Sequence, residues 1–183
     1  MTRAMRADSE RTVQAILEAA ERVLREHPAA SMEQIAKVAG VARTTVHRRF
    51  ASRDALVEAM TAWAAEQFRD AVEAARPDIA PPLVALHQVT ANVLRVKVGW
   101  GFAMSRSGTG DVERIHDEVR QSCIRLISRA KEAGVLREDV DVEWVRRVYY
   151  ALIHEAAEAG KAGADTDVMA ARVIDTLLKG VGA

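Results

Sequence analysis

Apolar residues recur along the chain at intervals of three and four positions, which is the spacing of one buried face of an α-helix. No run of β-branched residues alternates with polar ones, and only four prolines interrupt the 183 residues. Alanine is abundant and aromatic residues are scarce. The pattern therefore predicts an all-α fold packed closely on small side chains. The first helix is expected over about 9–25, with its buried stripe at Val13, Ile16, Leu17, Ala20, Val23 and Leu24.

Residues 31–50 carry the signals of two short helices joined by a tight turn. Ser31 and Gln34 have the spacing of a capping box, in which each side chain bonds the backbone amide of the other residue. Gly40 is expected to end this helix, because a left-handed residue often closes a helix and glycine adopts that conformation freely. A third helix follows over about 42–50, anchored on the first two by Val41, Val46 and Phe50.

Caps, prolines and glycines delimit the later helices. Ser52 is the expected cap of a long fourth helix that Pro77 ends, and Pro82 suits the first turn of the fifth. Four more helices are predicted over about 99–105, 111–133, 141–160 and 167–179. The sequence thus predicts nine helices in two domains, one formed by residues 1–53 and one by residues 54–183, with the helix from residue 52 as the link.

Charge is distributed unevenly although the net charge is zero. Residues 1–53 hold ten Lys and Arg against six Asp and Glu, whereas residues 54–183 hold sixteen against twenty. Between Thr44 and Arg53 there are three arginines and no acidic residue. This asymmetry favours a basic, phosphate-facing end and an acidic remainder.

Several features of the sequence indicate the cellular compartment. The single cysteine, Cys123, excludes an internal disulfide. The N-terminus is too charged for a secretory signal. The longest uncharged stretch, residues 79–94, falls short of the ~20 apolar residues that a membrane span needs. We therefore expect a soluble cytoplasmic protein with no membrane partner.

The segment from Ser31 to Phe50 meets the geometric requirements of a helix-turn-helix. Its third helix can enter a major groove, with its N-terminal residues at base edges and its flanks at phosphates. Arg43 can pair with guanine, and Thr44 and Thr45 can meet a thymine methyl group or a polar base edge. The candidate DNA contacts are Ser31, Arg43, Thr44, Thr45, His47, Arg48, Arg49 and Arg53.

The run SMEQIAKVAGVARTTVHRRF, followed by ASRDAL, resembles the DNA-binding signature of the TetR/AcrR family of regulators over about residues 10–58. A weaker similarity is EAGVLRED at 132–139. The resemblance implies a nine-helix homodimer in which helices one to three bind double-stranded operator DNA, helix four links, and helices five to nine bind a small-molecule effector and the partner. By position it places Arg43, Thr44 and Thr45 at bases, and His47, Arg49 and Arg53 at the DNA backbone.

Two residues depart from that family pattern. His47 stands where the family usually has an aromatic residue, most often tyrosine, and Arg49 stands where His or Tyr is frequent. Both side chains still donate hydrogen bonds to phosphate. DNA binding is therefore expected to persist, whereas the operator sequence does not follow from relatives.

Other chemistry is sparse. The pairs Glu113–His116 and His154–Glu158 have helical spacing, but each lacks the further ligands that a metal site needs. We predict no catalytic site, metal or cofactor. The Ala-rich helices eight and nine are expected to form the homodimer contact. Eight residues are candidates for an effector pocket: Trp100, Phe102, Met104, Cys123, Ile127, Tyr149, Tyr150 and His154.

These observations predict a repressor whose two recognition helices lie ~34–36 Å apart on a palindromic operator and which an effector releases. Two alternatives stay open at this point. One is a helical small-molecule-binding protein or enzyme whose DNA-binding module is non-functional. The other is a non-specific DNA binder, which usually carries more Lys and Arg than this chain.

Overall fold

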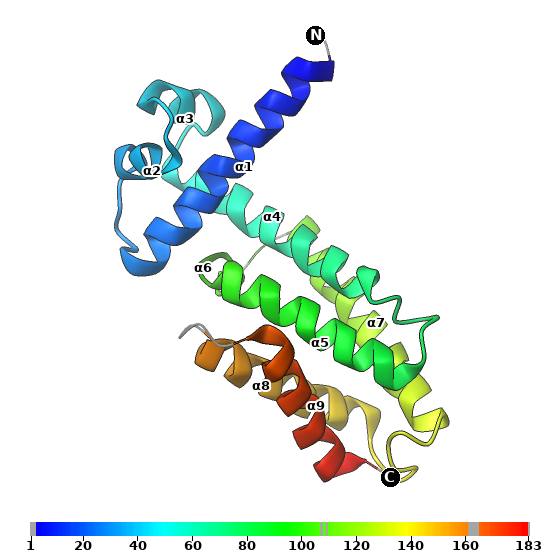
Figure 1. Cartoon of the computed structure of the whole chain (residues 1–183). Coiled ribbons are helices and arrows are strands. Elements are labelled where there is room, and N and C mark those ends of the chain that lie inside the picture. The colour runs from blue at the N-terminus through cyan, green and yellow to red at the C-terminus, as the bar shows by residue number, and fades with distance from the viewer. Residues whose placement is uncertain (1–2, 107, 109, 161–164, 183) are drawn as a thin grey trace. The chain divides into compact units, whose positions relative to one another are not determined.

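The computed structural model describes residues 3–106, 108, 110–160 and 165–182. Within these ranges the chain folds into nine α-helices, which confirms the all-α prediction (Figure 1). None of the described helices is long and apolar enough to cross a membrane. The helices are α1 (Arg3–Glu26), α2 (Met32–Ala39), α3 (Arg43–Arg49), α4 (Arg53–Ala74), α5 (Pro82–Gly99), α6 (Gly101–Met104), α7 (Asp111–Glu132), α8 (Val142–Gly160) and α9 (Thr166–Val181).

Most helix ends coincide with the expected caps. The Ser52 hydroxyl accepts a bond from the Ala55 amide at 3.1 Å, and the Asp141 carboxylate accepts one from the Trp144 amide at 2.7 Å. The start of α1 differs, because the helix begins at Arg3 rather than near Ser9. Residues 4–7 are good helix formers and include no breaker, so the helix extends through them.

The helices form two compact units. Unit 1 consists of residues 1–64 and 100–108, and unit 2 of residues 65–99 and 109–183. Helix α4 begins in unit 1 and ends in unit 2, and α6 belongs to unit 1 although its neighbours along the chain are α5 and α7. The functional division after residue 53 stays a prediction.

The core of unit 1 is small. Helix α1 packs on α2 and α6, and α2 packs on α3. The start of α4 adds Leu56 and Met60, both fully buried. From α3 only Val46 is buried, so one face of this helix is anchored and the other is left to solvent.

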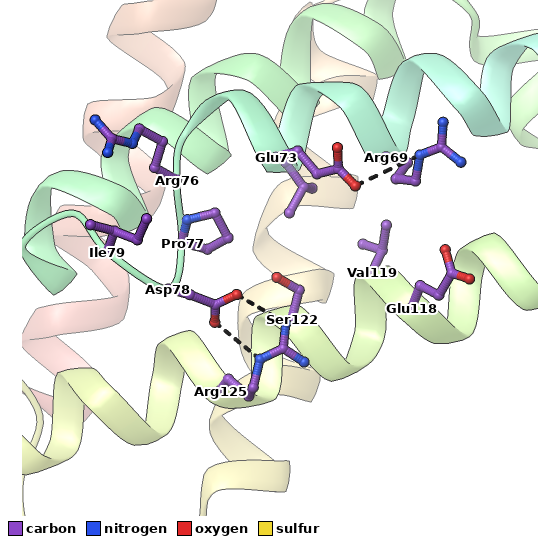
Figure 2. A pocket seen from close by; sticks show the side chains of 11 residues that line it. Arg69, Glu73, Arg76, Pro77, Asp78, Ile79, Glu118, Val119, Ser122 and Arg125 are labelled. Atoms are coloured by element: carbon purple, nitrogen blue, oxygen red, sulfur yellow. Dashed lines mark hydrogen bonds and ion pairs between the residues drawn. The ribbon is translucent and has the colours of Figure 1, made fainter.

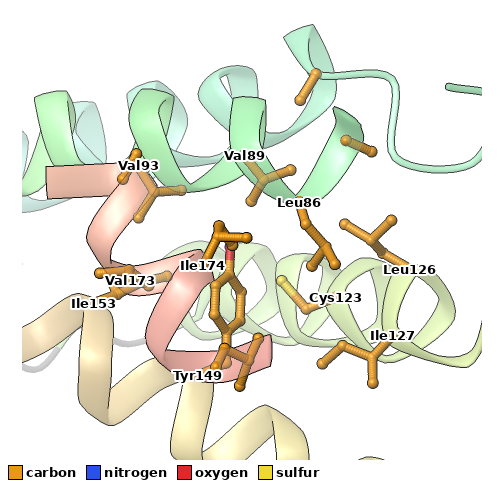
Figure 3. Packing of buried hydrophobic residues seen from close by; sticks show 14 of the residues in the cluster. Leu86, Val89, Val93, Cys123, Leu126, Ile127, Tyr149, Ile153, Val173 and Ile174 are labelled. Carbon is orange, nitrogen blue, oxygen red and sulfur yellow. The ribbon is translucent and has the colours of Figure 1, made fainter. Parts of the chain in front are cut away.

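Unit 2 is built around α5, which packs on α7, α8 and α9 (Figure 3). Its core is mainly aliphatic and includes a polar pair: the Tyr149 hydroxyl lies 2.7 Å from the Thr90 hydroxyl, and both residues are buried. The apolar side chains drawn near Tyr149 come from α5, α7, α8 and α9 and include Leu86, Val89, Val93, Leu126, Ile127, Ile153, Val173 and Ile174.

Candidate functional site

Helix α2 and the turn after it have the geometry of a helix-turn-helix. The Ser31 amide donates to the Gln34 side chain at 2.8 Å, and the Gln34 amide donates to the Ser31 hydroxyl at 3.3 Å, so the predicted capping box is present. Gly40 adopts the left-handed conformation, with φ 68° and ψ 26°. The Val41 amide then bonds back to the Ala36 carbonyl at 3.1 Å, which fixes the direction in which α3 leaves the turn.

Helix α3 presents a polar, acid-free face. Val46 and Phe50 are buried in unit 1, whereas Thr45 is half-buried. The other predicted contact residues of this helix are exposed side by side: Arg43, Thr44, His47, Arg48 and Arg49. Guanidinium and imidazole groups donate to phosphates and guanine edges, and threonine offers both a hydroxyl and a methyl group. This face can therefore contact the backbone and the bases of a duplex.

Arg43 has a partner within the protein. Its guanidinium lies 3.6 Å from the carboxylate of Glu33 in α2. The two side chains are 64% and 73% exposed, so water screens their attraction and the pair is weak. DNA can therefore replace Glu33 as the partner of Arg43 at small cost.

Arg53 is placed differently from the α3 residues. Its guanidinium donates to the Ala30 carbonyl at 3.4 Å and also to the Pro28 carbonyl, and thereby ties the start of α4 to the connection between α1 and α2. This structural role was not predicted. The contact of Arg53 with DNA phosphate stays a prediction, and Ser31 is exposed with its hydroxyl in the capping box.

Seven of the eight predicted effector residues are divided between two cores, and the eighth is exposed. Trp100, Phe102 and Met104 pack against the core of unit 1. Cys123, Ile127 and Tyr149 are buried members of the core of unit 2, Tyr150 packs against that core, and His154 is exposed on α8. An effector site built from this set stays a prediction.

Cys123 lies in a protected environment. Burial raises the pKa of its thiol, which bonds to Tyr150. The Tyr150 ring in turn lies under the Arg146 guanidinium, 4.8 Å from the ring centroid. A buried thiol with a raised pKa is a poor nucleophile, so the structure favours a packing role for Cys123.

Unit 2 contains an open cleft that sequence reasoning did not find (Figure 2). It measures about 430 Å³ and lies between the end of α4, the α4–α5 connection and α7. Val72, Pro77 and Val119 are its buried apolar members. Charged residues of both signs surround them, namely Arg69, Glu73, Arg76, Asp78, Glu118 and Arg125.

An ion pair fixes one side of the cleft. Arg125 donates from Nε and Nη2 to the two oxygens of Asp78 at 3.0 and 3.2 Å (Figure 2). These hydrogen bonds lower the pKa of the Asp78 carboxyl. Arg129 donates to the carbonyls of Pro77 and Ala80, so the α4–α5 connection is held to α7 by two arginines. Hydrogen bonds therefore hold this wall of the cleft in place.

Besides the contacts of Arg53, two polar interactions were not predicted from the sequence. The Thr90–Tyr149 pair joins residues 59 positions apart. Glu21, in α1, is only 2% exposed and accepts bonds from the amides of Phe102 and Ala103. The burial of Glu21 could have been predicted from the sequence, because it lies four residues after Leu17 and thus on the buried face of the helix. Among the described residues, no three His, Cys, Asp or Glu side chains gather as a metal site would need.

The chain is similar in sequence to known transcription regulators. Residues 16–60 match the family model described as bacterial regulatory proteins, tetR family. The chain is also 30% identical over 175 residues to the HTH-type transcriptional repressor LfrR of Mycolicibacterium smegmatis, covering 94% of this chain and 91% of the relative. The chain belongs to the TetR family.

Solved structures of TetR-like proteins agree. The structure of LfrR from Mycobacterium smegmatis in complex with proflavine is 29% identical, with a TM-score of 0.76 over 96% of this chain and 99% of that one. PfmR from Thermus thermophilus, at 20% identity, has the same fold with a TM-score of 0.76 over 90% of this chain and 97% of that one. As a TetR-family member, the chain is a ligand-responsive DNA-binding regulator of transcription.

Proposed function

We propose that this regulator is a homodimeric repressor whose two α3 helices read successive major grooves of a palindromic operator. The observation that carries the proposal is the exposed, acid-free face of α3, held by a capped α2 and a left-handed Gly40. Arg43, Thr44 and Thr45 serve as the base-reading residues. His47, Arg48 and Arg49 serve as phosphate partners, together with Ser31 and Arg53.

Selection of duplexes from a random pool by the purified protein tests this proposal. The native protein is expected to enrich an inverted repeat with half-sites about one helical turn apart. Arg43→Ala is expected to lose preference at one position of each half-site, which costs about 1–3 kcal/mol of discrimination there. Arg114→Ala, an exposed arginine of α7, is the matched control and should select the native sequence. A pool without enrichment, or without dyad symmetry, would contradict the proposal.

The phosphate contacts have a separate signature. Each contact contributes about 0.9 log unit of affinity per log unit of salt, because binding releases condensed counterions. Arg49→Ala is therefore expected to weaken binding to every duplex alike and to reduce the salt slope by about one. A change in the selected sequence would instead assign Arg49 to the bases.

We infer that the dimer forms through α8 and α9, which pack against each other. The supporting observation is that Trp144 of α8 is 61% exposed and Val168 of α9 is 53% exposed, although both are large and apolar. A glutamate at either position is expected to shift the protein from dimer to monomer in sedimentation experiments. Ile79→Glu, at an apolar residue that is 69% exposed outside these helices, is the control and should leave the dimer intact.

We propose the open cleft of unit 2 as the effector site. LfrR, which is similar to this chain, was solved with proflavine, a planar aromatic cation. The cleft combines the exposed apolar side chain of Ile79 with the carboxylates of Glu73 and Glu118, which suits an amphipathic cation. Proflavine is therefore the first probe, and its fluorescence on titration with protein is the readout.

Charge-removing variants locate the site. Glu73→Gln and Glu118→Gln are each expected to weaken proflavine binding several-fold, whereas Glu155→Gln on α8 makes the same charge change elsewhere and should not. Equal affinity in all three variants would place the ligand outside the cleft. The predicted pocket residues Cys123, Tyr149 and Tyr150 would then be the next to vary.

Our proposal assigns the chain no catalytic reaction, and places it in the cytoplasm where the operator is accessible.

A further inference from the structure

Glu21 is an acidic residue in the core of the DNA-binding unit. It lies on the face of α1 that also carries Leu17 and Leu24, and it is 2% exposed. A buried carboxylate is unfavourable unless hydrogen bonds replace its water. Glu21 accepts several such hydrogen bonds, and the donors show which segments of the chain it connects.

The partners of Glu21 come from α6 and from its own helix. Its Oε1 accepts the Phe102 amide at 2.8 Å, and its Oε2 accepts the Ala103 amide at 3.0 Å. Arg25, one turn further along α1, donates to Oε1 from Nη2 at 3.0 Å. All four groups belong to unit 1. The carboxylate therefore bonds two successive backbone amides of a segment that lies 81 and 82 positions away in the sequence.

Helix α6 lacks a cap of its own. Trp100, at its N-cap position, makes no side-chain bond to the first amides of the helix. Glu21 takes over this function from another helix, and Ala103 is buried in the unit 1 core beside it. The clamp is charge-assisted on both oxygens, which makes it stronger than bonds between neutral groups.

The position of α6 along the chain gives this clamp its importance. Its neighbours in sequence are α5 and α7, whose buried side chains build the core of unit 2. A rearrangement of α5 or α7 that displaces residues 100–105 therefore acts directly on the two backbone amides that are bonded to Glu21. Helix α1 in turn packs on α2 of the helix-turn-helix.

We propose that Glu21 is the positioning residue that couples unit 2 to DNA binding by clamping α6 to α1. The proposal rests on the DNA-binding function above and goes beyond it, since it names the contact through which regulation passes. Coupling between two sites is reciprocal: if a ligand in unit 2 changes DNA affinity by some factor, DNA changes the affinity of unit 2 for that ligand by the same factor, so bound DNA shifts unit 2 between its conformations. DNA alone can therefore test the clamp without a known effector.

Hydrogen exchange followed by mass spectrometry measures this coupling. The full-length protein is compared with and without a duplex that it has selected from a random pool. In the native protein, DNA is expected to change exchange in peptides of α5 and α7. Glu21→Gln is expected to abolish that change, while the dissociation constant for DNA shifts by less than about threefold. In the Glu21→Gln variant, the peptide spanning residues 100–104 should exchange about tenfold faster than in the native protein. The –NH2 group of the glutamine cannot accept a hydrogen bond, so one of the two backbone amides loses its partner.

Glu18→Gln is the matched control. Glu18 lies on the exposed side of α1, where it accepts a bond from Gln14 at 2.9 Å, and the variant makes the same charge change. It should retain the response of α5 and α7. Should Glu21→Gln fail to fold, as circular dichroism would reveal, Glu21→Asp replaces it, because the shorter side chain keeps the charge but cannot reach both amides.

Two outcomes would overturn the proposal. One is a response of α5 and α7 that persists in the Glu21 variant, which would reduce Glu21 to a structural residue. The other is the absence of any such response in the native protein when it is saturated with DNA. Failure of the proposed function appears earlier and separately, at the selection step, as a protein that enriches no duplex.

Discussion

The buried pair of Thr90 and Tyr149 allows a prediction in which the loss of stability depends on which partner is removed. The Thr90 hydroxyl lies 2.6 Å from the Leu86 carbonyl and 2.7 Å from the Tyr149 hydroxyl. Because a carbonyl only accepts, Thr90 gives its hydrogen to Leu86, and Tyr149 must donate to Thr90. Burial also raises the pKa of Tyr149, so its hydroxyl keeps its proton.

The two single substitutions therefore differ in cost. Thr90→Val keeps the shape but leaves the fully buried Tyr149 hydroxyl without an acceptor, at a cost of about 1–3 kcal/mol. Tyr149→Phe leaves Thr90 with its bond to Leu86, so the loss should be about 0.5–1.5 kcal/mol. In the double variant both partners are apolar, and it should be more stable than Thr90→Val alone.

Urea unfolding followed by circular dichroism, at one protein concentration, gives the free energy of unfolding for the four proteins of this cycle. The cycle isolates the interaction between the two hydroxyls from the packing of each side chain. If Thr90→Val cost less than Tyr149→Phe, or if the double variant were the least stable of the four, the assigned donor and acceptor would be wrong.

Three further predictions concern the helix-turn-helix and the cleft. Glu33→Gln removes the exposed partner of Arg43 and should tighten DNA binding up to about fivefold in fluorescence anisotropy, since such a pair is worth at most ~1 kcal/mol; unchanged or weaker binding would contradict this. Gly40→Ala should lower the free energy of unfolding by about 1–2 kcal/mol through its left-handed backbone alone, because a Cβ there meets no atom within 4 Å, and Gly40→Asn should cost less. The hydrogen bonds from Arg125 lower the pKa of Asp78 in the folded protein. The small stabilisation from this pair is therefore present above pH 3.8, the ordinary pKa, and is lost as the pH falls through the pKa of the folded state. The difference in free energy of unfolding between the native protein and Asp78→Asn should accordingly vanish in acid titrations.

The helix-turn-helix was predictable because its determinants are local. Ser31 and Gln34 are three residues apart, and Gly40 specifies the turn by its own conformation. The buried positions of α2 and α3 also follow from spacing. The apolar residues of these helices that face the core are Met32, Ile35, Ala36 and Val46. Short-range interactions thus account for the geometry of the helix-turn-helix.

The interactions that sequence reasoning missed are all non-local. Glu21 is acidic in a buried stripe, and its partners, the amides of Phe102 and Ala103, have no side-chain signature that a sequence displays. Arg53 looks like one more basic residue of the DNA face, yet backbone carbonyls of a distant connection bind its guanidinium. The cleft depends on how α4 and α7 pack, which periodicity does not specify.

The central claim is that the exposed face of α3 reads base sequence, and one ratio tests it most directly. The measurement is the affinity of the native protein for its selected duplex divided by its affinity for a scrambled duplex of equal length, at one salt concentration. A specific regulator should give a ratio of about 10³ or more, and Thr45→Ala should reduce it by roughly tenfold. A ratio near one for the native protein would contradict the account, because α3 would then hold phosphates without reading bases.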